Sequence, residues 1–179
     1  MSISSQDKRA RRVALNAILT ALAMILSYLE VLLPIGLIIP LPGFRLGLAN
    51  LVVLVAFFGL SKLDAAVISA TRILLMGLLF GTVTSLFFSA MGGLLSYLML
   101  LLLSRIGRRL SFLGTSILSA AAHNCGQIIA ASLLFGTSVI LSYLPVLLIA
   151  SVIFGSAVGL LLNLLVPRLT PILKKGGSV

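Results

Sequence analysis

The stretch His123-Asn124-Cys125-Gly126-Gln127 places three hydrogen-bonding side chains inside a run, 113–135, that is otherwise apolar or small. On a helix, His123 and Gln127 share a face one turn apart, and Asn124 and Gln127 are i,i+3 neighbours. Such side chains are costly to expose to lipid. They could therefore join helices by hydrogen bonds, worth about 0.6 kcal/mol each, or line a polar cavity that binds a solute. A metal site is not expected, because the chain has one His, one Cys and few carboxylates.

Arg72 and Glu30 are charged residues that interrupt two other apolar runs. Arg72 lies eight residues into a predicted helix, about 12 Å from its start at ~1.5 Å per residue. A charge at that depth costs about 2.5–3.5 kcal/mol on insertion scales and needs a partner. Two interpretations stay open: a structural Arg72–Glu30 pair, or contact of Arg72 with an anionic ligand, with Glu30 neutralising Arg72 when the site is empty.

Arg45 and Asn50 bracket Leu46-Gly47-Leu48-Ala49 at the expected outer mouth of the second helix. Arg45 could attract an anion there or reach the lipid headgroups. The preceding segment is apolar but holds three prolines and two glycines, so it cannot form a regular helix. Irregular backbone near a membrane must be covered by protein or line a cavity. We therefore expect residues 34–45 to form an outer loop that acts as a lid.

The amino-acid composition indicates whether the surface of the protein faces water or lipid. The chain has 179 residues, of which 60% are hydrophobic and 9% are charged, whereas soluble domains have about a quarter charged. Most of its surface must therefore face lipid. The apolar runs are continuous rather than alternating, which favours helices over a barrel. The net charge of +10 comes from basic residues between the runs, so it indicates topology, and nucleic acid is not an expected partner.

The apolar runs predict an all-α membrane protein with six transmembrane helices, flanked by a basic N-terminus, 1–12, and a tail, 167–179. Pro34 is expected to end the first helix, Asp64 to N-cap the third, and Pro167 and Pro171 to end the sixth. The predicted helices cover residues 13–33, 46–60, 64–80, 85–103, 113–135 and 140–166.

An even number of membrane helices puts both termini on one side, together with the turn at Lys62 and the loop 104–111. Positively charged residues stay cytoplasmic, and the opposite side carries only Arg45. Both termini are therefore predicted to be cytoplasmic. The basic residues on that side are Lys8, Arg9, Arg11, Arg12, Lys62, Arg105, Arg108, Arg109, Arg168, Lys174 and Lys175.

Ala10, Ala14, Ala17 and Ala21 are spaced to line one face of the first helix. Small residues permit close approach of another helix. The face could pack within the bundle, or it could dock onto another membrane protein. A second small-residue pair, Gly155 and Gly159, is expected to pack inside the bundle.

Several motifs of enzymes are absent from the sequence. It has no G-x-x-x-x-G-K-[ST] phosphate loop, so ATP hydrolysis of the usual kind is not expected. Three acidic residues are too few for the paired aspartate motifs that hold magnesium and a diphosphate. No nucleophile, histidine and acid set stands out. We therefore expect no catalytic residue and no cofactor.

Four stretches together carry a resemblance that extends over nearly the whole chain: 42–51, PGFRLGLANL; 72–81, RILLMGLLFG; 89–96, SAMGGLLS; and 122–127, AHNCGQ. They resemble the Gx transporter family, which is also labelled heptaprenyl diphosphate synthase component I. That family is similar to the substrate-binding (S) components of energy-coupling factor (ECF) transporters. The resemblance implies a six-helix bundle with cytoplasmic termini and a first outer loop that acts as a lid. It also implies docking, through small residues of the first helix, onto a transmembrane coupling subunit that carries two ATPases.

The main hypothesis is a multi-pass protein of the bacterial cell membrane that captures a small, anionic or electron-rich solute for an ATP-driven importer. One alternative is a non-catalytic membrane partner of a heptaprenyl diphosphate synthase in isoprenoid or quinone metabolism. A membrane scaffold is the third; it would explain the small-residue faces but not the mid-membrane polar residues. The residues expected to contact the solute are Glu30, Arg45, Asn50, Arg72, His123, Asn124 and Gln127.

Overall fold

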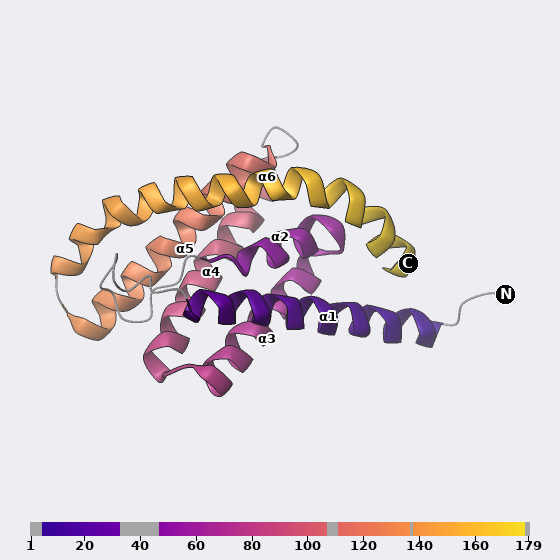
Figure 1. Ribbon diagram of the computed structural model, residues 1–179, viewed down its shortest axis with the longest axis horizontal. Helices are drawn as coiled ribbons and strands as arrows, with labels where there is room; N and C mark the ends of the chain where they lie inside the picture. Colours follow the sequence, from indigo (N-terminus) through magenta and orange to yellow (C-terminus); the bar gives the residue numbers. More distant parts are fainter. Residues whose placement is uncertain (1–4, 33–46, 107–110, 137, 178–179) are drawn as a thin grey trace.

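The computed structural model describes residues 5–32, 47–106, 111–136 and 138–177, and over these residues the protein is helical, without strands (Figure 1). The long helices are α1 (Ser5–Leu32), α3 (Lys62–Phe80), α4 (Val83–Ile106), α5 (Phe112–Phe135) and α6 (Leu144–Gly177). The short helix α2 (Asn50–Gly59) and the 3₁₀ helix η2 (Ser138–Tyr143) complete the described elements. The prediction of an all-α membrane protein with six α-helices is confirmed, but within the described residues only five of the six predicted transmembrane helices are long enough to span a membrane.

Five of these helices are long and apolar enough to cross a membrane, so the chain is a multi-pass membrane protein. The exception is α2, which has 10 residues and therefore spans only about 15 Å of a hydrocarbon core about 30 Å thick. It is shorter than the predicted helix because Gly47 has a φ of +83° and the next residues form a turn that ends where α2 begins. Apolar residues surround the axis of α2 on all sides, and most of them are buried, as expected for a helix enclosed by others.

The helices alternate in direction, so the start of α1 and the end of α6 lie at the same end of the bundle (Figure 1). At that end Arg12 of α1 contacts Asp64 in the first turn of α3, and Gly59, the last residue of α2, lies against Leu173 near the end of α6. This geometry agrees with the prediction that the two termini share one side of the membrane. Its assignment to the cytoplasm stays a prediction.

Aromatic pairs join the helices toward the opposite end of the bundle. Tyr28 near the end of α1 packs on Phe80 at the end of α3, with ring centroids 5.2 Å apart. Phe88 near the start of α4 lies 6.4 Å from Phe135, the last residue of α5. Rings tilted at such distances stabilise a helix pair beyond simple burial of area. The ends of neighbouring helices are therefore held together at both sides of the bundle.

Several predicted helix boundaries are wrong, and α1 already begins at Ser5 and not near residue 13. Asp64 does not cap α3, which begins at Lys62; its N-cap is Ser61, whose hydroxyl accepts a hydrogen bond from the Asp64 backbone N–H at 3.1 Å. Pro167 and Pro171 do not end α6, which continues through both. Each proline removes a helical hydrogen bond, but burial of Val166 and Leu173 holds this part of α6 against the bundle. Packing therefore outweighs the local cost, and α6 follows a curved path (Figure 1).

The start of the last membrane helix also differs from its prediction at residue 140. Residues Ser138–Tyr143 form η2, and α6 begins only at Leu144. Pro145 is thus the second residue of α6, where a missing backbone N–H leaves no helical bond broken. The 3₁₀ turn lets the chain reverse direction immediately before this proline.

Glycines allow α6 to pack directly on the α5 backbone. A Cβ added to Gly155 would lie 2.7 Å from the Cα of Ile117, and one added to Gly159 would lie 2.7 Å from the Cα of Leu113. Neither approach leaves room for a side chain. The prediction that this small-residue pair packs inside the bundle is confirmed.

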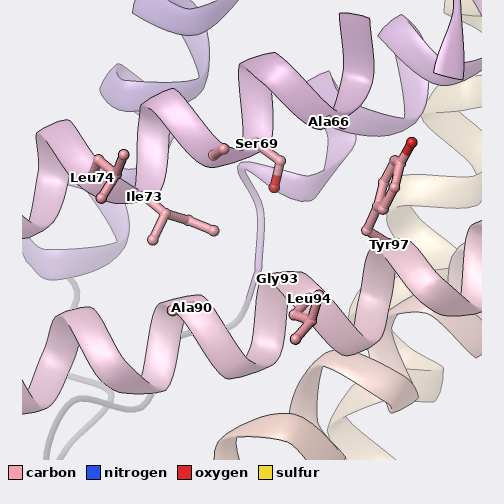
Figure 2. Close-up of a pocket in the computed structure, with 9 residues that line it drawn as sticks. Ala66, Ser69, Ile73, Leu74, Ala90, Gly93, Leu94 and Tyr97 are labelled. Atoms are coloured by element: carbon pink, nitrogen blue, oxygen red, sulfur yellow. The ribbon is translucent and has the colours of Figure 1, made fainter. Parts of the chain in front are cut away.

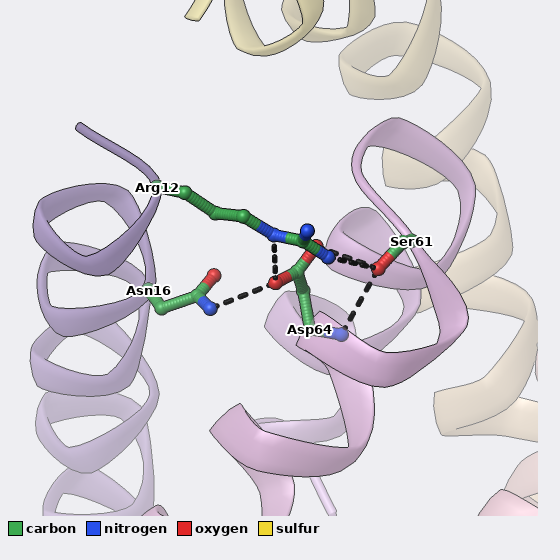
Figure 3. A network of polar contacts seen from close by, with 4 residues as sticks. All are labelled: Arg12, Asn16, Ser61 and Asp64. Atoms are coloured by element: carbon green, nitrogen blue, oxygen red, sulfur yellow. Dashed lines mark hydrogen bonds and ion pairs between the residues drawn. The ribbon is translucent and has the colours of Figure 1, made fainter. Parts of the chain in front are cut away.

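A polar network ties the start of α1 to the turn between α2 and α3 (Figure 3). Arg12 donates from Nε and Nη2 to the two carboxylate oxygens of Asp64, at 2.9 Å each. Asn16 donates to the same carboxylate at 2.8 Å, and the hydroxyl of Ser61 donates at 2.6 Å. A two-point Arg–carboxylate pair fixes orientation as well as distance. The network therefore fixes how the first turns of α1 lie against α3.

We expect Asp64→Ala to destabilise the bundle more than Arg12→Ala, because Asp64 also holds Asn16 and Ser61. The Arg12 side chain is 44% exposed, so a double-mutant cycle should give a coupling energy of only about 1 kcal/mol. Unfolding titrations in mixed micelles measure all three variants, with exposed Arg11→Ala as the control. Additive effects of the two single substitutions would contradict this arrangement.

Candidate functional site

A polar stripe runs along α5 and faces the inside of the bundle. Ser119, His123 and Gln127 follow one another at one-turn intervals and are all buried. Nε2 of Gln127 lies 3.0 Å from Nε2 of His123. The prediction that these two side chains share a face is confirmed. When the Gln127 amide donates this hydrogen bond, the imidazole is neutral and carries its proton on Nδ1.

The imidazole of His123 lies flat against α4 because Gly92 has no side chain. A Cβ added to Gly92 would lie 2.8 Å from Cε1 and 2.9 Å from Nδ1 of the ring. Gly126, three residues after His123 on α5, lies against α4 as well, since its added Cβ would be 2.5 Å from the Met91 carbonyl oxygen. The two glycines, on facing helices, thus create the narrow slot that holds the ring.

Asn50, the first residue of α2, joins the stripe to α4. Its Nδ2 donates to Ser119 Oγ at 2.9 Å and to Ser96 Oγ at 3.1 Å, and the two hydroxyls lie 2.7 Å apart. Three elements thus meet through one side-chain amide. Asn50 lies at the start of α2, and the structure adds its two serine partners; its predicted place on the outer side of the membrane stays a prediction.

Arg72 and Glu30 lie on the other side of the same region and are both buried. Nη1 of Arg72 donates to the Ser27 hydroxyl at 2.9 Å, and Ser27 is nearly one turn before Glu30 on α1. The Glu30 carboxylate accepts a hydrogen bond from the backbone N–H of Leu48. The guanidinium therefore reaches the turn of α1 that carries Glu30, as both interpretations of Arg72 require.

The turn at Gly47 and Leu48 connects the two halves of this polar region. Leu48 binds Glu30, while Gly47 lies against His123: a Cβ added to Gly47 would be 3.7 Å from Cδ2 of the ring. Its φ of +83° is a conformation that glycine adopts without strain. Beside the turn is a hollow of about 10 Å³, bounded on its far side by α5 and α6, which is about the space of one water molecule. Glu30, Arg72, His123 and Gln127 are all buried, so their side chains lie inside the bundle and do not point outward to lipid.

The side chains described so far form the polar cluster, which comprises half-buried Asn50 and the buried residues Ser27, Glu30, Arg72, Ser96, Ser119, His123 and Gln127. Asn124 does not join this polar cluster. Its Nδ2 donates to the Leu147 carbonyl oxygen at 3.0 Å and to Ser151 Oγ at 2.8 Å, both on α6. The amide thus forms an interhelical hydrogen bond, which was the alternative left open for this residue. Arg45 and the expected lid, 34–45, lie outside the described residues.

Ala10, Ala14, Ala17 and Ala21 are all exposed on α1. Of the two interpretations of this face, packing within the bundle and docking onto another protein, the exposure agrees with docking. The prediction stays untested, because no partner chain defines the contact.

Sequence reasoning missed several members of the cluster, chiefly Ser27, Ser96, Ser119, Gly47 and Gly92. One signal was available: Ser119, His123 and Gln127 repeat at four-residue spacing, which identifies a single helix face. The serines of α1 and α4 gave no such signal, because a lone serine in an apolar helix commonly bonds its own backbone.

The site offers amide, hydroxyl and imidazole groups, one guanidinium and one carboxylate. Within the described residues, no three His, Cys, Asp or Glu side chains are grouped to hold a metal ion. Such a set of donors and acceptors can orient a polar molecule through several hydrogen bonds at once.

A family model described as heptaprenyl diphosphate synthase component I matches residues 19–165, which is most of the chain. The chain belongs to this family. The match confirms the resemblance seen in the sequence, and it includes every residue of the polar cluster. No curated protein and no solved structure matches this component I family member. What is shown is therefore a multi-pass membrane protein of the component I family, with a buried polar cluster at its centre.

Proposed function

We propose that this protein is the substrate-binding subunit of an ECF-type importer in the bacterial cell membrane and is not itself an enzyme. The observation that carries the proposal is the convergence of α1, α2, α3, α4 and α5 on one buried polar cluster. Buried polar groups at membrane depth are expensive, and they commonly mark the path or the site of a solute. A scaffold would need the exposed helix faces but not this cluster.

The proposed solute is small and either anionic or electron-rich. Arg72 supplies a buried positive charge, and the amides of Asn50 and Gln127 supply hydrogen-bond donors. In the empty state Glu30 offsets the charge of Arg72. The solute would enter beside the Gly47–Leu48 turn, because that turn touches both Glu30 and His123. Opening this contact would expose both halves of the cluster together.

The proposed partners are a transmembrane coupling subunit and two ATPases, with docking through the alanine face of α1. The chain has no phosphate loop of its own, so ATP must be hydrolysed elsewhere. Small exposed residues let a partner helix approach closely in lipid. Because the Arg12–Asp64 network holds this part of α1, the face is presented in a fixed orientation.

A second candidate is favoured by the name of the family, which refers to a prenyl diphosphate synthase. Under that proposal the chain is a non-catalytic membrane partner of a soluble synthase. Purification of the tagged protein from its own membranes in mild detergent separates the two. Coupling and ATPase subunits together with a retained small molecule would support the importer. A prenyl synthase without a transport ATPase would overturn it.

We expect Ala17→Phe to reduce co-purification of the coupling subunit by at least about tenfold, because a bulky ring prevents close helix approach. Ala17 is exposed, so the bundle itself should remain folded. The matched control is Ile25→Phe, an exposed position on the same helix outside the alanine set. Equal recovery of the partner with both variants would exclude this face as the docking site.

A further inference from the structure

An apolar groove runs between α3 and α4 (Figure 2), and exposed residues such as Leu74 and Leu94 lie at its rim. Its volume is about 390 Å³. Ala66, Ser69 and Ala70 line one wall, and Gly93 lines the other, with Tyr97 toward one end. From residue 66 to residue 74 the groove follows α3 for about 12 Å at ~1.5 Å per residue.

The groove exists because small residues face one another across the two helices. The two helices are in contact at Gly93, where the end of the Ile73 side chain packs. A Cβ added to Gly93 would lie 2.5 Å from Ile73 Cδ1. Leu74 and Leu94 border the groove and are about half exposed. Water gains few hydrogen bonds on such a lining, and an empty groove would forfeit dispersion contacts. At this depth in the membrane, hydrocarbon is the filling that the lining favours.

Positive charge lies beyond the Tyr97 end of the groove. The Tyr97 hydroxyl donates to the Lys62 carbonyl oxygen at 2.9 Å, and the Lys62 ammonium donates to Ser104 Oγ at 2.9 Å. Arg105 follows Ser104 on α4, and both cationic side chains are exposed. In the described part of the chain neither forms an ion pair with a carboxylate. The ammonium retains donors for a further acceptor.

We propose that this groove binds one acyl chain of an anionic phospholipid, with the phosphate of its headgroup at Lys62 and Arg105. The arrangement matches an amphiphile: an apolar channel that leads to two exposed cations at the membrane surface. The site is separate from the solute site and does not depend on it.

Native mass spectrometry of the purified full-length protein tests the proposal. The probes are phosphatidylglycerol and phosphatidylcholine with identical acyl chains, added to delipidated protein in detergent. We expect one phosphatidylglycerol to be retained. In Ala70→Phe, where a ring fills the groove from its exposed rim, retention should fall at least about tenfold. Val152→Phe, an exposed position on α6, should leave it unchanged. Equal retention in both variants would overturn the proposal.

The headgroup contact has its own test. In the double variant Lys62→Gln, Arg105→Gln the preference for phosphatidylglycerol over phosphatidylcholine should fall by roughly tenfold. Arg168→Gln, which removes another exposed charge near the same end, should preserve this preference.

If Ala70→Phe does not fold, Ala90→Phe fills the groove from the opposite wall. A tightly retained prenyl phosphate or a protein partner in place of the phospholipid would overturn the assignment.

Discussion

Replacing Arg72 with alanine should abolish retention of the solute while leaving the protein inserted in the membrane. Arg72 is only 6% exposed, so the proposed contact with the solute would be largely removed from water. Truncating one member of a buried charged contact costs about 2–5 kcal/mol, which corresponds to a loss of affinity of roughly 30-fold or more. Insertion should not suffer, because the substitution removes a charge that is costly at this depth.

The measurement is the amount of each small molecule that co-purifies with wild-type and variant protein, extracted and quantified by mass spectrometry. Arg72→Lys keeps the charge but loses the planar fork, so it should give an intermediate amount. Arg168→Ala, an exposed arginine on α6, serves as the control and should retain the solute fully. Undiminished solute on Arg72→Ala would remove Arg72 from the site.

Gly126→Ala should destabilise the bundle by about 2 kcal/mol, although alanine is the better helix former by about 1 kcal/mol. The added Cβ would lie 2.5 Å from the Met91 carbonyl oxygen and 2.8 Å from the Cα of Gly92. These are backbone atoms of α4, which cannot rotate away. The two helices must separate, and the slot that holds His123 against Gly92 widens with them. We therefore expect loss of solute as well.

The matched control is Gly93→Ala, on the facing helix. There the added Cβ meets the end of the Ile73 side chain at 2.5 Å, and the next atom is 3.6 Å away. Because Ile73 can adopt another rotamer, stability should change by less than about 1 kcal/mol. Thermal melting in detergent compares the two variants. Similar melting temperatures for Gly126→Ala and wild type would show that α4 and α5 do not approach as closely as described.

Local sequence patterns were sufficient to predict the class of fold. Long apolar runs require hydrogen-bonded helices in lipid. They placed α3, α4 and α5 close to their observed bounds, whereas α1 begins earlier than predicted. They did not show that α2 is short, because its start depends on the turn at Gly47. Nor did they show that α6 continues past Pro167 and Pro171, since local propensity favours an end there and only burial against the bundle overrides it.

For the candidate site too, some features followed from the sequence and others depended on the tertiary structure. The spacing of His123 and Gln127 determined that they share a face, because the period of a helix is a local property. Only the tertiary structure decided which helix covers each face. It turned Asn124 toward α6, and it brought Asn50 to serines that are 46 and 69 residues away in the chain. These contacts depend on how whole helices pack, which the sequence of one helix does not specify.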